Sequence, residues 1–141
     1  MSVQKGIDAF LAGASHAVVG ASANRAKYGN MVLRAFLNNV RAVYPINPRA
    51  QVIEGVRCYP DLASLARDKA VHGVSVITPP KITEQIVLDA ADAGIMHIWM
   101  QPGAESPEAI EHAEALGMNV IAGGPCVLVV MGFSRSREVQ P

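Results

Sequence analysis

Short apolar runs that each stop at a turn residue alternate with segments of helical periodicity along most of this chain. The first run, residues 17–19, stops at Gly20, and later runs stop before Asn47, Thr78 and Gln101. Apolar runs without polar alternation are typical of strands buried on both faces of a parallel sheet. Strands that alternate with helices predict an α/β fold: a doubly wound parallel sheet covered by helices on both faces, in three α/β/α layers.

Apolar spacing and capping residues locate the expected elements. Strands are predicted at residues 41–46, 74–77, 95–100 and 118–122, with a small strand and turn at 51–56 and a last apolar run at 127–130. A first helix is predicted at 3–14, and a second runs from the first loop to Asn38–Asn39 with Val32, Ala35 and Phe36 in register. A third helix follows the cap Asp61, with Leu62, Leu65 and Ala66 inward, and a fourth runs from 82 to Gly94, with Ile82, Ile86 and Ala90 on one stripe. A fifth helix begins after Ser106–Pro107. The polar tail 134–141 is expected to fray.

Length and composition predict one domain spanning residues 1–141 that folds without metal or disulfide. Two cysteines without close spacing, Cys58 and Cys126, fit a reducing compartment, so we expect a cytoplasmic protein. No apolar run is long enough to span a bilayer, and the first residues lack the features of a signal peptide. A net charge of zero argues against a general nucleic-acid surface.

The charges are unevenly distributed along the chain. Residues 25–57 contain six Lys or Arg and one acid, whereas residues 82–134 contain seven acids and no Lys or Arg. Both segments are compatible with ordinary solvated faces. The basic segment also follows the first glycine turn, which favours a small polyanionic ligand.

The candidate binding site lies at the predicted carboxyl ends of the strands, where a doubly wound sheet holds its ligand. After Gly20, the backbone N–H groups of Ala21 and Ser22 and the Ser22 hydroxyl can bind phosphate oxygens. Asn24 and Lys27 extend the polar loop, Lys27 supplies a positive charge, and Tyr28 either packs on a ligand or belongs to the core.

The usual ligand of such a fold is NAD(P), and its fingerprint is incomplete here. Gly20 is followed by Ala21 and Ser22 instead of a second glycine, and Gly29 stands too far along the chain to supply the third. The acid expected after the second strand is replaced by Asn47, Pro48 and Arg49. Arg49 would favour a ribose phosphate, which both NADP and coenzyme A carry. A P-loop and the acids of a phosphoacceptor domain are also missing.

Several short motifs, taken in order, resemble the stand-alone CoA-binding domain family, which is related to the N-terminal CoA-binding domain of the succinyl-CoA synthetase alpha subunit. The motifs are Val19-Gly20-Ala21-Ser22, Tyr28-Gly29, Tyr44-Pro45-Ile46-Asn47-Pro48, Gly55, Trp99-Met100-Gln101-Pro102-Gly103 and Cys126. The match runs from about residue 16 to residue 126. Each motif alone is weakly specific, but their order and spacing together are specific.

This resemblance implies a Rossmann-like domain that holds coenzyme A or an acyl-CoA by its ADP portion. The first loop would lie at the pyrophosphate, and Asn47, Pro48 and Arg49 near the adenosine and its 3′-phosphate. The turn Thr78-Pro79-Pro80 would line the path of the adenine or pantetheine. At the next strand end, Gln101 is a candidate to hydrogen-bond a ligand amide, with Gly103 beside it on the same rim.

Catalysis is not expected from this chain, because the ligase relatives carry their chemistry on other domains and subunits. His16, His72, His97 and His112 show no metal-ligand spacing, and no metal site is predicted. Cys126 is the candidate for reactivity: Gly123, Gly124 and Pro125 would leave its thiol near the rim, where it could form a mixed disulfide with the CoA thiol, although a buried packing role is more common.

Three functions therefore remain open. The chain is expected to be a CoA-binding module acting as carrier, sensor or partner subunit, with a homo-oligomer or a protein partner left open. The alternatives are an NADP-dependent oxidoreductase and a CoA-thiol enzyme that uses Cys126, for which the sequence shows no general base.

Overall fold

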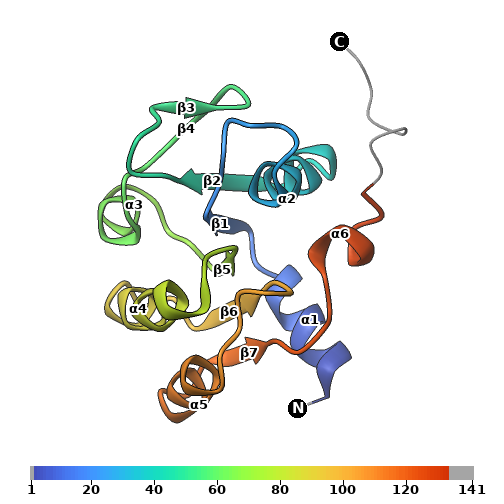
Figure 1. Ribbon diagram of the computed structural model, residues 1–141, viewed down its shortest axis with the longest axis vertical. Helices are drawn as coiled ribbons and strands as arrows, with labels where there is room; N and C mark the ends of the chain where they lie inside the picture. Colours follow the sequence, from blue (N-terminus) through green and yellow to red (C-terminus); the bar gives the residue numbers. More distant parts are fainter. Residues whose placement is uncertain (1, 134–141) are drawn as a thin grey trace.

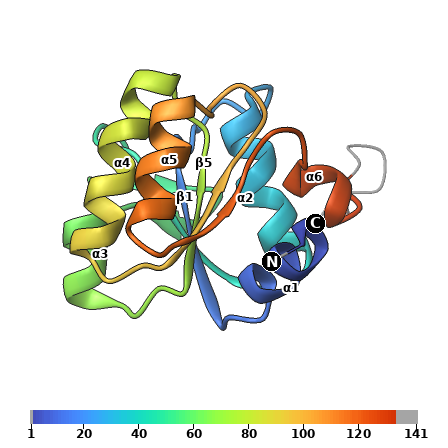
Figure 2. The same cartoon turned by 90° about the horizontal axis from the view of Figure 1, so that it is seen from below.

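In a computed structural model, which describes residues 2–133, the chain forms a five-stranded parallel sheet with helices on both faces (Figures 1 and 2). The strands are β1 (Ser15–Val19), β2 (Ala42–Ile46), β5 (Gly73–Val76), β6 (His97–Met100) and β7 (Asn119–Ile121), and a separate hairpin contains β3 (Val52–Ile53) and β4 (Val56–Arg57). The helices are α1 (Val3–Leu11), α2 (Tyr28–Asn38), α3 (Leu62–Asp68), α4 (Pro80–Asp92), α5 (Pro107–Ala115) and α6 (Val127–Val130). The predicted α/β fold is confirmed.

The strand order β2-β1-β5-β6-β7 places the reversal of winding between β1 and β5. From β1 the chain first crosses to β2 on one side, and later strands are added on the other side. Loops that leave the carboxyl ends of β1 and β5 therefore run in opposite directions and leave a crevice between them, which is where sheets of this type bind ligands.

Two apolar clusters hold the layers together, one on each face of the sheet. Helices α3, α4 and α5 cover one face, where Leu65, Val87 and Ala109 pack on Ile98. Helices α1, α2 and α6 cover the other face, where Phe10, Phe36 and Val127 surround Trp99. Trp99 and Met100, in β6, have no exposed surface and belong to the core.

Most local predictions agree with the structure, and the differences lie at helix ends and faces. Asp61 and Ser106 cap α3 and α5 as expected, through bonds from Ser64 N and Ala109 N. Helix α1 ends at Leu11, earlier than predicted, and the apolar run 127–130 is the short helix α6. Ala66 is exposed and does not face the core, so that prediction was wrong. The tail 134–141 lies outside the described residues.

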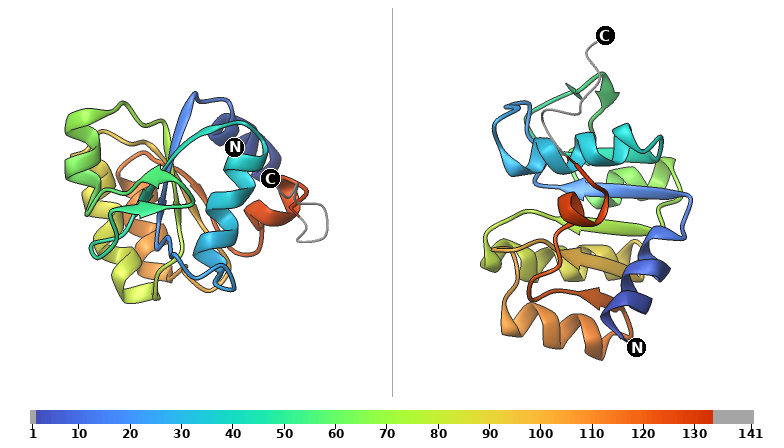
Figure 3. Two further views of the ribbon diagram at one scale, coloured as in Figure 1. Left: turned by 90° about the horizontal axis from the view of Figure 1, so that it is seen from above. Right: turned by 90° about the vertical axis from the view of Figure 1, so that its right-hand side faces the viewer.

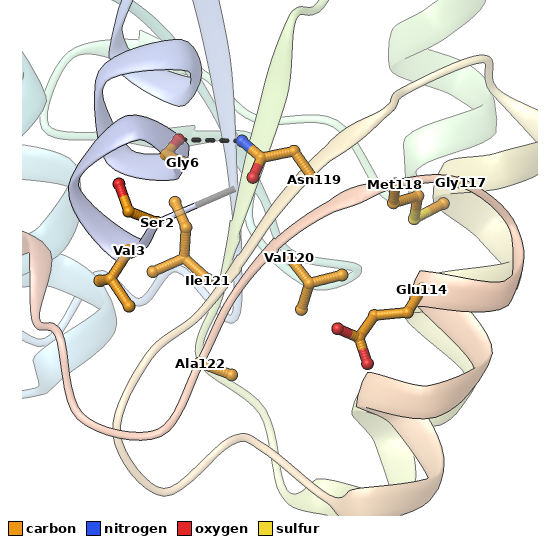
Figure 4. Close-up of a pocket in the computed structure, with 10 residues that line it drawn as sticks. All are labelled: Ser2, Val3, Gly6, Glu114, Gly117, Met118, Asn119, Val120, Ile121 and Ala122. Atoms are coloured by element: carbon orange, nitrogen blue, oxygen red, sulfur yellow. Dashed lines mark hydrogen bonds between the residues drawn. The ribbon is translucent and has the colours of Figure 1, made fainter.

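Side chains from the amino ends of the strands hold the last turns of α1 against the sheet. Each donates to a backbone carbonyl of the helix: His16 Nε2 to Phe10 O at 2.7 Å, His72 Nε2 to Ala9 O at 2.8 Å, Arg41 Nη1 to Leu11 O at 2.7 Å and Asn119 Nδ2 to Gly6 O at 2.9 Å (Figure 4). The bonds to Ala9, Phe10 and Leu11 satisfy carbonyls that the helix end would otherwise leave unpaired, and the bond to Gly6 O adds a contact further back along α1. The histidines near this end thus have a structural role.

The imidazole of His16 is fully buried and must stay neutral. Its Nε2–H donates to Phe10 O, and its Nδ1 has no hydrogen-bond partner. A second proton would therefore sit on a buried nitrogen without an acceptor. Burial is the largest cause that lowers the pKa of His16 to about 4, and the positive charge of Arg41 and the neighbouring His72 and His97 act in the same direction. Burial, with His72 beside it, also lowers the pKa of His97.

We expect the protein to lose stability as the pH falls below the ordinary pKa of histidine. With a pKa of about 4 in the folded state, His16 binds a proton in the unfolded chain first. The free energy of unfolding should therefore decrease by about 2 kcal/mol between pH 7 and pH 5. Urea denaturation at the two pH values measures this decrease.

A His16→Gln variant removes the titrating group and keeps an amide that can donate to Phe10 O, so its pH dependence should be smaller. The matched control is His112→Gln, because His112 is exposed on α5. Equal pH dependence in wild type and His16→Gln would contradict the role given to His16.

Candidate functional site

The carboxyl end of β1 is built on contacts that leave no room for a side chain. Gly20 has a φ of +93°, and a Cβ atom there would lie 1.8 Å from Ile77 O. A Cβ atom on Gly29, in the first turn of α2, would lie 2.0 Å from Gly20 O. The backbones of β1, α2 and the end of β5 therefore meet directly at this point.

This contact corrects the prediction about Gly29. The sequence distance from Gly20 suggested that Gly29 could not act as the glycine that lets a helix pack closely on a strand. The loop between them folds back, so Gly29 does lie against Gly20 and allows that close approach. The spacing of the NAD(P) fingerprint is absent, while the packing that its last glycine permits is present.

Side chains within the loop 21–27 fix its shape. Ser22 Oγ accepts from Asn24 N at 3.1 Å, and Asn24 Oδ1 accepts from Ala26 N at 3.0 Å. Lys27 is the N-cap of α2, and its side chain makes no capping bond. Asn30 N and Met31 N donate to Lys27 O, so the N–H groups that α2 can offer to an anion are those of Tyr28 and Gly29. Ser22 and Asn24 first serve to hold the loop in place.

The loop is also braced from outside by the β3–β4 hairpin. The ribbon of the hairpin lies beside the loop that leads to α2 (Figures 1 and 3). Glu54, at the tip of the hairpin, accepts from Asn30 Nδ2 at 3.1 Å and pairs with Arg25 Nε at 3.4 Å. Asn30 Nδ2 also donates to Ser22 O at 2.8 Å, and the buried Arg34 donates to Asn30 Oδ1 at 2.7 Å. These bonds connect the hairpin, the helix and the loop in one polar network.

The structure divides the basic residues of segment 25–57 between structural and exposed positions. Arg34 is buried in the network beside the loop, Arg41 holds α1 at the opposite end of the sheet, and Arg57 pairs with Asp68 at 3.4 Å. Lys27 and Arg49 are exposed beside the carboxyl ends of the strands. The basic segment as a whole therefore does not face one ligand, contrary to its simplest interpretation.

Asn47 links the end of β2 to the first loop. Its Nδ2 donates to Ala21 O at 2.9 Å, and its Oδ1 accepts from Arg49 N at 2.7 Å and Ala50 N at 3.2 Å. The side chain thus ties two strand ends together and shapes the turn that carries Pro48 and Arg49. Its polar atoms are engaged in these bonds, so we assign Asn47 a positioning role.

An apolar slot of about 240 Å³ opens between these strand ends at the reversal of winding. Its lining comes from the ends of β1, β2 and β5, from the start of α3 and from α4: Val19, Gly20, Ala21, Ile46, Asn47, Pro48, Pro60, Asp61, Leu62, Thr78, Ile82, Ile86 and Asp89. Among the predicted site residues, the slot brings together Gly20, Ala21, Asn47, Pro48 and Thr78. A flat, mostly apolar group fits such a lining.

The slot explains why the predicted inward stripe of α4 was partly wrong. The core face of α4 carries Thr83, Val87 and Ala90. Ile82 is 50% exposed, and both Ile82 and Ile86 line the slot. Of the predicted stripe, Ala90 is buried in the core and Ile86 is partly buried against it, whereas Ile82 does not face the core. The sequence showed the apolar spacing but not that two of its members face an open crevice.

The remaining predicted residues lie around the slot or beyond it. Thr78 Oγ1 and Thr83 Oγ1 are 2.7 Å apart, and Pro79 and Pro80 are the exposed start of α4. Gly103, with a φ of +94°, lies in the exposed turn after β6. Gln101 has no exposed surface and does not line the slot.

Gln101 belongs instead to a small polar cluster with Tyr28 and Cys126. Tyr28 Oη lies 3.3 Å from Gln101 Oε1 and 2.5 Å from Cys126 Sγ, and Val127 N donates to Gln101 Oε1 at 2.9 Å. Burial and the bond to Cys126 raise the pKa of the Tyr28 hydroxyl, so it stays protonated. The cluster joins the start of α2, the end of β6 and the start of α6.

A hollow beside β7 fits a phosphorylated ligand less well than the slot. This hollow of about 450 Å³, between α1 and α5, has Glu114 as its charged lining residue (Figure 4). Within residues 2–133, no three His, Cys, Asp or Glu side chains are grouped to hold a metal ion. No helix in that range is long and apolar enough to cross a membrane.

Comparison with known sequences identifies the family. Residues 14–132 match the family described as CoA binding domain, which is most of the chain. This chain belongs to that family. The crevice lies where α/β sheets of this kind bind ligands. Its position is therefore consistent with the family assignment.

The relatives of this CoA-binding domain include both small proteins and parts of ligases. A conserved hypothetical protein from Pyrococcus furiosus is 39% identical, with a TM-score of 0.77 over 82% of this chain and 97% of that one. The ADP-forming acetate–CoA ligase I of Archaeoglobus fulgidus is 25% identical over 115 residues, 74% of this chain and 16% of the ligase. This chain therefore spans about a sixth of that curated relative.

A solved ligase structure shows the same fold. The dinucleotide-forming acetyl-coenzyme A synthetase 1 of Ca. Korarchaeum cryptofilum, in complex with phosphate and ADP, is 28% identical with a TM-score of 0.69. The match covers 77% of this chain and 25% of the synthetase. The fold thus occurs as a whole small protein and as a portion of larger enzymes.

We expect Gly20→Ala to lower the free energy of unfolding by more than the cost of placing an alanine in a left-handed backbone conformation. Gly117, at the end of α5, has a φ of +80° and nothing closer than 4.0 Å to a new Cβ, so Gly117→Ala measures backbone strain by itself. That strain is about 1–2 kcal/mol. Gly20→Ala adds a collision with Ile77 O and should cost at least about 2 kcal/mol more. Urea denaturation compares them, and equal losses would contradict the contact.

Proposed function

We propose that this domain binds coenzyme A or an acyl-CoA through its ADP portion, without catalysis of its own. The observation that carries the proposal is the apolar slot at the reversal of winding, which lies directly beside the N–H groups of the glycine loop. One ligand with an adenine and a pyrophosphate would occupy both. The family assignment supports coenzyme A as that ligand.

The pyrophosphate is proposed to bind at the loop from Gly20 to Tyr28. The loop offers backbone N–H groups and the positive end of α2, which is 11 residues long. Lys27 stands at the start of this helix with an exposed side chain, so it can approach a phosphate without breaking an existing contact. Ser22 contributes through its backbone N–H as well as its hydroxyl.

The adenine is proposed to lie in the apolar slot, between the prolines near β2 and the isoleucines of α4. Pro48 and Pro60 line one part of the slot, and Ile82 and Ile86 line another. Exposed isoleucine surface next to a crevice gains free energy when a planar ring covers it. This placement gives the exposed side chain of Ile82 a function.

The 3′-phosphate of the ribose is proposed to face Arg49. Asn47 Oδ1 accepts from Arg49 N at 2.7 Å and so fixes the backbone of the turn that carries the guanidinium. Arginine binds phosphate through paired charge-assisted hydrogen bonds. The Thr78-Pro79-Pro80 turn would then border the path of the pantetheine toward β6.

Catalysis would need a group that activates a nucleophile, and the described residues offer none at Cys126. Its Sγ contacts the Tyr28 hydroxyl, whose pKa is raised, so it does not act as a base. His16, His72 and His97 lie at the opposite end of the sheet, around α1. These positions support a binding module and weaken the alternative of a CoA-thiol enzyme.

The second candidate is an NADP-dependent oxidoreductase, which Arg49 alone would also suit. The approach of Gly29 to Gly20 reproduces one element of dinucleotide binding. Two free cysteines, Cys58 and Cys126, fit the proposed cytoplasmic location for either function. The relative stabilisation by CoA and by NADPH distinguishes the two functions.

A thermal-shift panel with CoA, acetyl-CoA, 3′-dephospho-CoA, NAD and NADPH tests the proposal. A ligand at a hundredfold excess over its Kd stabilises the folded protein by ~2.7 kcal/mol, which raises the Tm measurably. We expect shifts with CoA and acetyl-CoA that exceed those with NAD and NADPH. A larger shift with NADPH would favour the oxidoreductase, and no shift with CoA at millimolar concentration would end the proposal.

Arg49 should account for the preference for CoA over 3′-dephospho-CoA. The wild type is expected to bind dephospho-CoA about tenfold more weakly, equal to about 1.4 kcal/mol. Arg49→Gln should bind the two ligands with similar Kd values, measured by calorimetry. Arg67→Gln, in the last turn of α3, removes the same charge at a distance and should keep the preference. A preference retained by Arg49→Gln would show that Arg49 is misplaced.

Ile82 provides a test of the adenine slot that is separate from folding. Because Ile82 is 50% exposed, Ile82→Gln should leave the free energy of unfolding nearly unchanged. It should weaken CoA binding by about tenfold through lost apolar contact. Leu88→Gln is the matched control, since Leu88 is 38% exposed on the same helix and does not line the slot. Equal affinities of the two variants would place the adenine elsewhere.

A further inference from the structure

The hydrogen bonds around Tyr28, Gln101 and Cys126 determine where each proton lies. Val127 N can only donate, so the atom of Gln101 that faces it at 2.9 Å must be the carboxamide oxygen. Tyr28 Oη–H donates to the same oxygen at 3.3 Å. The remaining contact, between Tyr28 Oη and Cys126 Sγ, then has the thiol as donor. The Cys126 thiol hydrogen is therefore directed at the Tyr28 oxygen.

The same assignment leaves the amide nitrogen of Gln101 without a partner. Gln101 has no exposed surface, and its Nε2 has no acceptor. Flipping the carboxamide would place its nitrogen opposite Val127 N and remove the acceptor of that N–H. A flip therefore cannot give Nε2 a partner without leaving Val127 N unpaired. A buried donor of this kind is costly to leave unpaired. The cluster thus contains a donor that matches a carbonyl from outside the chain.

This cluster lies next to the proposed phosphate loop. Tyr28 is the first residue of α2, directly after the N-cap Lys27. Cys126 comes from the segment that leads from β7 to α6 and passes beside the start of α2 (Figure 2). A flexible arm attached to a pyrophosphate at the loop can therefore fold back onto the cluster.

We propose that Cys126 captures the thiol end of coenzyme A as a mixed disulfide, and this inference rests on the proposed function. The capturing reaction is thiol–disulfide exchange with CoA disulfide. The Cys126 thiol loses its proton and its sulfur attacks one sulfur of CoA disulfide; the disulfide bond of that molecule breaks, and the departing CoA thiolate takes up a proton. The products are protein–S–S–CoA and one CoA thiol, so no other oxidant is needed.

Gln101 is the residue that positions the captured arm. The amide carbonyl of the cysteamine unit is close to the sulfur along the pantetheine chain, and the Gln101 carboxamide is linked to Cys126 Sγ through one shared contact, the Tyr28 hydroxyl. Forming the mixed disulfide removes the thiol hydrogen and with it the Tyr28–Cys126 bond. Opening of that bond gives the carbonyl access to the unpaired Nε2.

Intact-mass spectrometry after incubation with CoA disulfide tests the capture. We expect one adduct with the mass of CoA less one hydrogen from each thiol, mapped by peptide digestion to Cys126 and reversed by reductant. Cys126→Ser should form no adduct. Cys58→Ala is the matched control, because Cys58 is the other free cysteine and is buried, and it should still form the adduct. An adduct mapped to Cys58 would overturn the proposal.

Competing disulfides distinguish directed capture from ordinary thiol reactivity. At roughly 10 μM disulfide, a bound nucleotide that holds the reacting sulfur at about millimolar effective concentration should make CoA disulfide react about a hundredfold faster than oxidised glutathione. ADP should slow the reaction with CoA disulfide and leave that with oxidised glutathione unchanged. Equal rates for the two disulfides would show a merely accessible thiol and overturn the inference.

Tyr28→Phe tests the assignment of the protons. This variant removes the acceptor of the thiol hydrogen, so exchange with CoA disulfide should become faster by roughly twofold to tenfold. A slower reaction would show that the Tyr28 hydroxyl stabilises the thiolate instead, and it would overturn the proton assignment.

Thermal shift with CoA in the presence of reductant separates failure of the capture from failure of the proposed CoA binding. A shift with no adduct under CoA disulfide leaves the proposed function standing and ends the capture. No shift at all ends both.

Discussion

The direct approach of three backbone segments at the end of β1 is the contact on which the functional end of this domain depends. Gly20 turns with a positive φ under Ile77 O, and Gly29 packs its backbone on Gly20 O. A methyl group at Gly29 would push α2 away from the end of β1, and one at Gly20 would push the end of β1 away from Ile77. Since the loop between them presents its N–H groups only when α2 starts at this position, the geometry proposed for phosphate binding follows from the absence of two side chains.

The two ends of the sheet use their polar groups in opposite ways. At the amino ends, side chains of His16, His72, Arg41 and Asn119 are committed to carbonyls of α1. At the carboxyl ends, the start of α2 lacks a side-chain cap, and Lys27 is exposed beside it. One end is therefore closed by internal hydrogen bonds, while the other keeps donors and positive charge that a ligand can use.

The sequence predicted the order of the elements because local signals define it. Asp61 and Ser106 act through bonds to residues three positions away, so their capping role is visible in the sequence alone. The site was predicted less completely, because its contacts join distant segments. The approach of Gly29 to Gly20 depends on the path of a loop.

Helical periodicity also has a physical limit as evidence. It marks Ile82 as apolar and in register with Ala90, but an apolar face can cover the core or border a crevice, and only the position of β2 and α3 decides between them. The basic segment shows the same limit. Arg34 and Arg41 follow the same charge pattern, yet one is buried beside the loop and the other lies at the far end of the sheet.

The β3–β4 hairpin shows how rigidity at the site is maintained at some conformational cost. Its tip places Glu54 at a φ of 51°, a left-handed conformation that asparagine or glycine adopts more easily. A carboxylate is needed there, because it pairs with Arg25 and accepts from Asn30, which itself holds Ser22 O. The strain of about 1–2 kcal/mol is offset by bonds that fix the loop before a ligand arrives. A loop ordered in advance loses less entropy on binding, which favours the proposed binding of a polyanion at this loop.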